Sequence, residues 1–189
     1  MSEGAGIDKI VAVSNTGPLI SAFQCGRTDL LERYFSVMYI TASELSELDR
    51  HGWAEDIREL IAEGFVSVAA ELGEREKELA EEVAKRIATT PTSHDPDWRN
   101  HLPEAEAIVL MQQRKHLMVE QILLDEKAAR QVAQELGLPL TGFPGVLGRA
   151  GLDGLLTQSE IRQLLKTCQQ QGTHYSDELI EMVVHTYGR

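Results

Sequence analysis

The sequence IVAVSNTGP at residues 10–18 is the stretch from which the fold is inferred. Its first half, residues 10–13, is apolar and β-branched, which predicts a buried strand, and Pro18 is suited to the first turn of a helix. Asn15 and Thr16 therefore lie where a strand ends and a helix begins. A buried strand that leads directly into a helix is typical of a parallel sheet, in which ligands bind beyond the carboxyl ends of the strands.

Further apolar runs predict more strands, and helical patterns alternate with them. The strands are expected at residues 37–40, 65–68, 121–124 and 138–141. Helices are expected at residues 18–23, 29–34, 54–63, 71–88, 104–116 and 126–136, with another that starts at residue 41 and a polar loop at 89–101. This order predicts an α/β fold whose parallel sheet is covered by helices on both faces. We expect residues 1–150 to form this domain, and 151–189 to be a helical extension packed on it.

The composition limits the classes of protein to which the chain can belong. Of its 189 residues 42% are hydrophobic, and 18 basic against 30 acidic side chains give a net charge of −12. The hydrophobic fraction excludes wholesale disorder, and the acidic excess excludes a protein that coats DNA regardless of sequence. Cys25 and Cys168 are far apart in the sequence and predict neither a disulfide framework nor a thiolate metal site. With no signal peptide and no membrane-length apolar run, we expect a cytoplasmic protein that does not contact membranes.

Acidic and amide side chains gather at the predicted carboxyl edge of the sheet. They come from four segments, as Asn15 and Thr16, Glu44 and Glu47, Glu104 and Glu106, and Asp125 and Glu126. Such a group of like charges is unfavourable unless it holds a cation, and oxygen ligands without thiolate or imidazole favour Mg²⁺ or Mn²⁺. Alternatively, glutamates in first turns stabilise helices through the helix dipole, and Glu44 completes a capping box. The residues alone leave both interpretations open.

Five stretches resemble, in the same order, the motifs of PIN-domain proteins, a family that includes nucleases related to VapC-type toxins. They are residues 13–20 (VSNTGPLI), 40–48 (ITASELSEL), 103–108 (PEAEAI), 123–130 (LLDEKAAR) and 136–148 (LGLPLTGFPGVLG). The resemblance spans about residues 10–150, and the C-terminal helices also resemble the tail of that subgroup. Each motif is short, so it is their common order that indicates the family. The resemblance implies a three-layer α/β/α PIN-like fold.

The resemblance also implies Mg²⁺- or Mn²⁺-dependent ribonuclease activity and assigns roles to individual residues. The four acidic positions fall on Asn15, on Glu47, on Glu104 with Glu106 as the alternative, and on Asp125 or Glu126. Thr16 matches the small polar residue beside the first acid, and Lys127, Arg130 and Arg149 are expected near the same edge, where they would contact RNA phosphates. The implied partners are RNA, an antitoxin protein and a second copy of the chain in a homodimer.

Two departures from the family pattern bear on activity. The family's first acidic residue is usually Asp, whereas Asn15 brings no charge and cannot act as a base at neutral pH. Phe143 stands where a small hydroxyl residue is common. The alternative hypothesis is therefore a catalytically weakened PIN-like module that binds RNA or a protein partner.

Three other motifs receive plainer interpretations. His94 and His101 lie in the polar loop at a spacing that matches no standard zinc site. The acidic run at residues 71–82 is typical of a solvated helix face. Gly142, Gly145, Gly148 and Gly151 predict tight turns near the edge of the sheet, since no P-loop lysine follows them.

Overall fold

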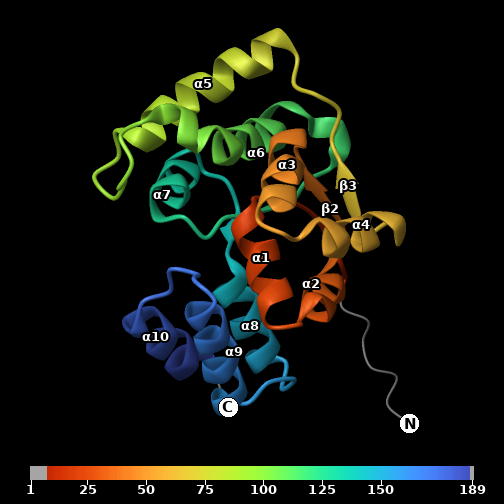
Figure 1. Cartoon of the computed structure of the whole chain (residues 1–189), viewed down its shortest axis with the longest axis vertical. Coiled ribbons are helices and arrows are strands. Elements are labelled where there is room, and N and C mark those ends of the chain that lie inside the picture. Colours follow the sequence, from red (N-terminus) through yellow and green to blue (C-terminus); the bar gives the residue numbers. More distant parts are fainter. Residues whose placement is uncertain (1–7, 188–189) are drawn as a thin grey trace.

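The computed structural model describes residues 8–187. The prediction that no signal peptide is present concerns residues 1–7, which lie outside this range. Within it, five strands form one sheet and ten α-helices surround them (Figure 1). The strands are β1 (Ile10–Ser14), β2 (Phe35–Ile40), β3 (Val66–Val68), β4 (Gln121–Leu123) and β5 (Leu140–Thr141). The helices are α1 (Thr16–Gln24), α2 (Thr28–Tyr34), α3 (Ala42–Arg50), α4 (Ala54–Ala62), α5 (Glu74–Ala88), α6 (Leu102–Gln113), α7 (Lys127–Glu135), α8 (Phe143–Leu152), α9 (Gln158–Gln170) and α10 (Asp177–Tyr187), with 3-10 turns at Trp98–His101 and Lys115–Leu117.

The sheet has the order β3-β2-β1-β4-β5, and every pair of neighbouring strands is parallel. β1 lies in the middle and pairs with both β2 and β4. Its continuous apolar sequence suits that place, because a central parallel strand is buried on both faces. The carboxyl ends of β1, β2 and β4 therefore meet at one edge of the sheet.

The two faces of the sheet carry separate hydrophobic cores. Ala12 contributes to the core formed with α1–α4 and α8–α10, and the next residue, Val13, contributes to the core formed with α5, α6 and α7. This alternation follows from the strand geometry, in which successive side chains point to opposite faces. Figure 1 shows α5 and α6 at one end of the view and α8–α10 at the other. The three-layer α/β/α fold predicted from the sequence is confirmed.

The glycine-rich segment that follows β5 is a helix, so the prediction of tight turns is wrong. The glycines let other chain segments come close to α8. A Cβ at Gly148 would lie 2.6 Å from Cδ2 of Tyr187, and one at Gly151 would lie 2.6 Å from the Tyr187 carbonyl oxygen. α10 thus packs directly against the backbone of α8. The C-terminal helices add Ile161, Leu165 and Val184 to the same core as Ala12.

Element boundaries differ in detail from the sequence prediction. The helix expected at 104–116 runs from Leu102 to Gln113, and a separate 3-10 turn follows it. Across residues 8–187, none of the helices has the length and apolar character needed to cross a bilayer.

Candidate functional site

The junction between β1 and α1 presents Asn15 and Thr16 at the carboxyl edge, each only 4% exposed. Asn15 is the N-cap of α1, and its Oδ1 accepts a hydrogen bond from the Gly17 amide at 3.2 Å. Its Nδ2 is buried and has no hydrogen-bond partner. The Thr16 hydroxyl donates to Oε2 of Glu47 at 3.0 Å. The end of the central strand is therefore joined directly to α3.

Glu44 and Glu47 come from α3, which begins at the end of β2. Glu44 completes the predicted capping box, since its Oε2 accepts the Thr41 amide hydrogen bond at 2.6 Å. The side chain is fully buried, and Oε1 has no partner. Burial raises the pKa of Glu44 well above its ordinary value, and the charges of Glu104 and Glu106 raise it further. Glu44 thus has a capping role and also borders the acidic group.

Glu104, in the first turn of α6, is a predicted metal ligand whose carboxyl group is buried. Its Oε2 is buried without a hydrogen-bond partner. Burial is the main cause that raises the pKa of Glu104 to about 7, and the charges of Glu47 and Glu126 add to it. Carboxylates from α3, α6 and the start of α7 therefore influence one another at this edge. Near neutral pH, Glu104 is divided between its protonated and ionised forms.

Glu106, two residues further along α6, faces a neighbouring hollow. With Thr41, Ser43 and Lys77, it lines a cavity of about 180 Å³ beside the amino end of α3. The alternative third acid therefore faces this cavity, and its charge, like that of Glu104, raises the pKa of Glu44.

Asp125 and Glu126 have different surroundings, although they are adjacent. Glu126 is the N-cap of α7, and its oxygens accept the amide hydrogen bonds of Ala128 and Ala129 at 3.1 and 2.6 Å. Oδ1 of Asp125 accepts from the Phe143 amide at 2.9 Å, and Oδ2 accepts from the Tyr175 hydroxyl at 2.6 Å. Burial raises the pKa of Asp125, against the effect of these two donors.

Tyr175 contacts the site, although no feature of the sequence around it predicts this. It lies 50 positions beyond Asp125, outside the stretches that resemble family motifs. A lone tyrosine between two predicted helices carries no local signal of a contact with the sheet edge. Phe143, the second departure, contacts Asp125 through its backbone amide, which any residue other than proline would supply.

The basic residues predicted beside the site divide into two groups. Nη1 of Arg130 donates to the Leu124 carbonyl at 2.7 Å, and Lys127 is exposed at the start of α7, so both lie at the carboxyl edge. The predicted position of Arg149 is wrong. Arg149 pairs with Asp153 at 3.2 Å and lines a cavity of about 340 Å³ at the amino ends of the strands. α8 runs away from the edge, and six residues of helix span about 9 Å.

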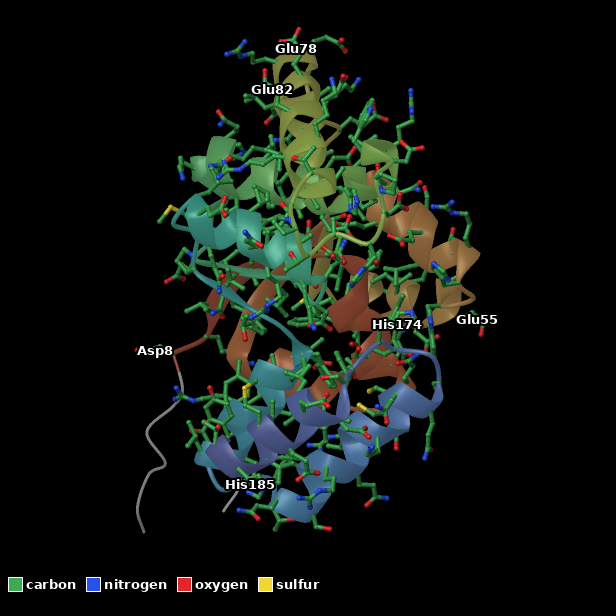
Figure 2. The ribbon with its side chains drawn as sticks, turned by 90° about the vertical axis from the view of Figure 1, so that its left-hand side faces the viewer. Asp8, Glu55, Glu78, Glu82, His174 and His185 are labelled. Carbon is green, nitrogen blue, oxygen red and sulfur yellow. The ribbon has the colours of Figure 1, made fainter. Side chains whose placement is uncertain are left out.

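The polar loop and the acidic run each approach this region at one point, since the charge of His101 lowers the pKa of Glu104 and Lys77 lines the cavity with Glu106. His101 is 6% exposed, and its Nε2 lies 2.8 Å from the Asp95 carbonyl oxygen, which accounts for this imidazole structurally. Figure 2 shows Glu78 and Glu82 on the outer surface of α5. Both contribute to a solvated helix face.

The donor set at the edge fits a hard cation by its chemistry. Among the described residues, no three Asp, Glu, His or Cys side chains are grouped closely enough to hold an ion by themselves. Mg²⁺, however, commonly takes only one or two carboxylates and completes its shell with water and substrate phosphate. Glu47 and Glu104 are candidates for these two carboxylates. The charge of Glu47 raises the pKa of Glu104, so the two side chains are close enough to interact, and Oε2 of Glu104 has no hydrogen-bond partner.

A family model, DUF3368, described as a PIN domain, matches residues 11–189. Apart from Ile10 at the start of β1, the match therefore includes all five strands and the C-terminal helices. No curated protein and no solved structure shows a significant match to the chain.

Proposed function

This chain belongs to the PIN-domain family, whose fold is nuclease-like, and we propose that it is a divalent-metal-dependent endoribonuclease that hydrolyses RNA phosphodiesters. The observation that carries the proposal is Glu104, which has a buried oxygen without a partner and a pKa raised to about 7 beside Glu47 and Glu126. Burial and the charges of Glu47 and Glu126 both oppose ionisation of Glu104, and a bound cation would offset that cost. We propose RNA as the substrate because the resemblance of the sequence motifs to PIN-domain nucleases implies ribonuclease activity.

Glu47 and Glu104 are the residues that would hold Mg²⁺ or Mn²⁺, with Asp125 beside the amino end of α1. When bound, such an ion activates water and stabilises the leaving oxygen of a phosphodiester. Thr16 fixes the Glu47 carboxylate through its hydroxyl. Without an ion the pKa of Glu104 is raised to about 7, so binding of Mg²⁺ or Mn²⁺ near neutral pH would displace a proton from this carboxyl group.

Positive charge for the RNA backbone comes from the start of α7. Lys127 is exposed there, and Arg130 lies nearby with one guanidinium nitrogen on the Leu124 carbonyl. Phosphate contacts of this kind fix the position of a strand without reading its sequence. With a net charge of −12, binding should depend on this small basic rim and on the metal rather than on the charge of the whole surface.

The proposal is tested with the purified full chain, single-stranded RNA and Mn²⁺. We expect cleavage by the unaltered protein and its loss in Glu104→Gln, which removes the negative charge but keeps the shape. Glu55→Gln is the matched control, because Glu55 also lies in the first turn of a helix but is exposed at the outer edge of the molecule (Figure 2). If the unaltered protein neither cleaves RNA nor binds Mn²⁺ in calorimetry, the proposal is wrong.

One observation favours the alternative of a weakened module that binds RNA or a protein. The Oδ1 of Asn15 is occupied by the Gly17 amide, and Nδ2 is a buried donor without a partner. An aspartate at this position would add a charge where the amide nitrogen now stands. If only the Asn15→Asp variant cleaves RNA and binds Mn²⁺, the alternative is the better description.

The resemblance to VapC-type toxins extends the proposal to a biological role. A ribonuclease toxin arrests growth when it is expressed without its protein antitoxin. We expect induced expression in a bacterial host to slow growth, and Glu104→Gln to relieve the effect. If the host grows equally well with both chains, the toxin role is wrong, whereas the ribonuclease proposal is unaffected.

A further inference from the structure

Tyr175 connects the C-terminal helices to the carboxyl edge of the sheet. It lies between α9 and α10 and is 5% exposed. Its hydroxyl lies 2.6 Å from Oδ2 of Asp125 and 2.8 Å from Oγ of Ser21, which is fully buried on α1. One hydroxyl therefore links the acid after β4, the first helix and the last part of the chain.

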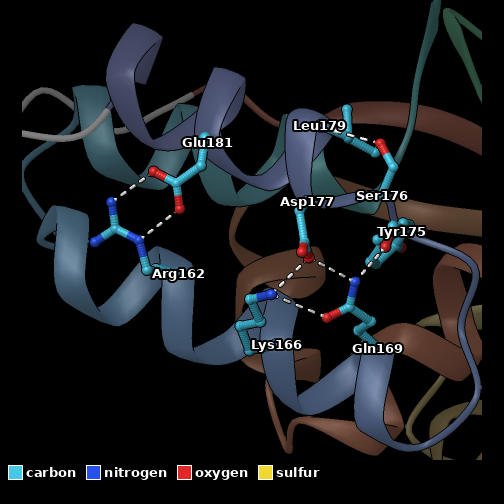
Figure 3. A network of polar contacts seen from close by, with 8 residues as sticks. All are labelled: Arg162, Lys166, Gln169, Tyr175, Ser176, Asp177, Leu179 and Glu181. Atoms are coloured by element: carbon cyan, nitrogen blue, oxygen red, sulfur yellow. Dashed lines mark hydrogen bonds and ion pairs between the residues drawn. The ribbon is translucent and has the colours of Figure 1, made fainter.

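The backbone around Tyr175 is held in place by side chains of α9 and α10 (Figure 3). Nε2 of Gln169 donates to the Tyr175 carbonyl at 2.7 Å and to Oδ1 of Asp177 at 3.0 Å. Lys166 donates to the same Asp177 oxygen at 2.6 Å. The position of the tyrosine is thus fixed at its backbone as well as at its hydroxyl.

The Asp125 carboxylate is held at both oxygens. Oδ1 accepts from the Phe143 amide and Oδ2 accepts from Tyr175, so rotation about its last bond would break one or both hydrogen bonds. A carboxylate oxygen has two lone pairs, which leaves each oxygen able to accept once more. The group stands against the amino end of α1, since a Cβ at Gly17 would lie 3.5 Å from Cβ of Asp125.

We propose that Tyr175 is a positioning residue of the nuclease site, which holds Asp125 in the orientation needed for metal binding. The inference rests on the proposed function. The C-terminal helical extension, which carries Tyr175, would then contribute a residue to the site. Hydrogen-bond donors that orient metal-binding carboxylates affect metal affinity even though they do not touch the ion.

The test measures Mn²⁺ binding to the full chain by calorimetry, without RNA. We expect Tyr175→Phe, which keeps the ring and removes the hydroxyl, to raise the Mn²⁺ dissociation constant by about 10–100-fold. Tyr34→Phe is the matched control, because the Tyr34 hydroxyl donates to Asp153 at 2.8 Å, near the amino ends of the strands. That variant should bind Mn²⁺ as the unaltered chain does.

A double-variant cycle separates positioning from general packing. If Tyr175 acts through Asp125, Tyr175→Phe has no further effect on Mn²⁺ affinity in an Asp125→Asn background. Full additivity of the two losses overturns the proposal. Gln169→Ala, which frees the Tyr175 carbonyl, is the second variant and should weaken binding in the same direction.

The remaining outcomes distinguish this inference from the function on which it rests. If the unaltered chain binds Mn²⁺ and cleaves RNA, and Tyr175→Phe does both equally well, the positioning role is wrong and the proposed function stands. If the unaltered chain neither binds Mn²⁺ nor cleaves RNA, both are wrong, because Tyr175 then has no metal site to serve.

Discussion

The Thr16 hydroxyl donates a hydrogen bond to Oε2 of Glu47 at 3.0 Å, which ties the first residue of α1 to α3. The two residues are 31 positions apart and meet because β1 and β2 are parallel neighbours that end at the same edge. The hydroxyl leaves Oε1 of Glu47 beside His51, whose Nε2 lies 3.8 Å away. Thr16 thus orients a proposed metal ligand.

We predict that Thr16→Val lowers the rate of RNA cleavage by about 10–100-fold, because valine keeps the shape and removes the donor that orients Glu47. The free energy of unfolding should fall by only about 1 kcal/mol, the usual contribution of one hydrogen bond. Thr89→Val is the control, since the Thr89 hydroxyl bonds the Lys85 carbonyl on the exposed end of α5. Equal rates in both variants would contradict an orienting role.

A second prediction concerns the pH dependence of stability and follows from Glu104. Its pKa rises from 4.5 to about 7 on folding, so the folded protein takes up a proton between these values. The contribution of Glu104 to the free energy of unfolding is therefore greatest below pH 4.5, and it is lost as the pH rises through 7. We expect Glu104→Gln to be more stable than the unaltered chain at pH 8, by at most about 3 kcal/mol at 1.4 kcal/mol per pKa unit, and equally stable at pH 4.

Urea unfolding at the two pH values measures this difference, with Glu55→Gln as the variant that should show none. The same experiment with Mn²⁺ at pH 8 should stabilise the unaltered chain more than Glu104→Gln, because a ligand that binds only the folded state adds to its stability. A stability difference that is equal at pH 4 and pH 8 would exclude a titrating Glu104 as its cause.

The parts of the fold that depend on local pattern could be predicted from the sequence. The apolar run of β1, residues 10–13, and the capping box of Thr41 and Glu44 are each contained within a few residues. Once parallel strands are assumed, Glu47 and Glu104 must approach the same edge, as they do in the structure.

Long-range contacts could not be predicted in this way. The glycines of α8 suggest turns until the close approach of Tyr187 to Gly148 and Gly151 is known. The sequence motif places Arg149 at the wrong edge, because its position depends on the direction of α8, which no local pattern predicts. The contact between Tyr175 and Asp125 depends on how the last two helices fold back, and no short motif encodes that path.

The last prediction compares two glycines of α8 whose surroundings differ in stiffness. A Cβ at Gly151 would lie 2.6 Å from the Tyr187 carbonyl oxygen and 2.8 Å from Cδ1 of Ile161. A Cβ at Gly145 would clash with Oγ1 of Thr141, and a turn of that one side chain about χ1 would relieve the clash at the cost of its hydrogen bond to the Gly142 carbonyl oxygen. Alanine improves helix propensity by about 1 kcal/mol at either position, whereas overpacking against backbone costs about 1–3 kcal/mol.

We therefore expect Gly151→Ala to lower the free energy of unfolding in urea and Gly145→Ala to leave it unchanged or raise it slightly. Because the obstacle at Gly151 is the backbone at the end of α10, the protein must shift that helix to relieve the clash, and a rotamer change cannot do so. Hydrogen exchange of the α10 amides should accordingly speed up in Gly151→Ala alone. If Gly151→Ala is as stable as Gly145→Ala, α10 does not pack against α8 as closely as the structure indicates.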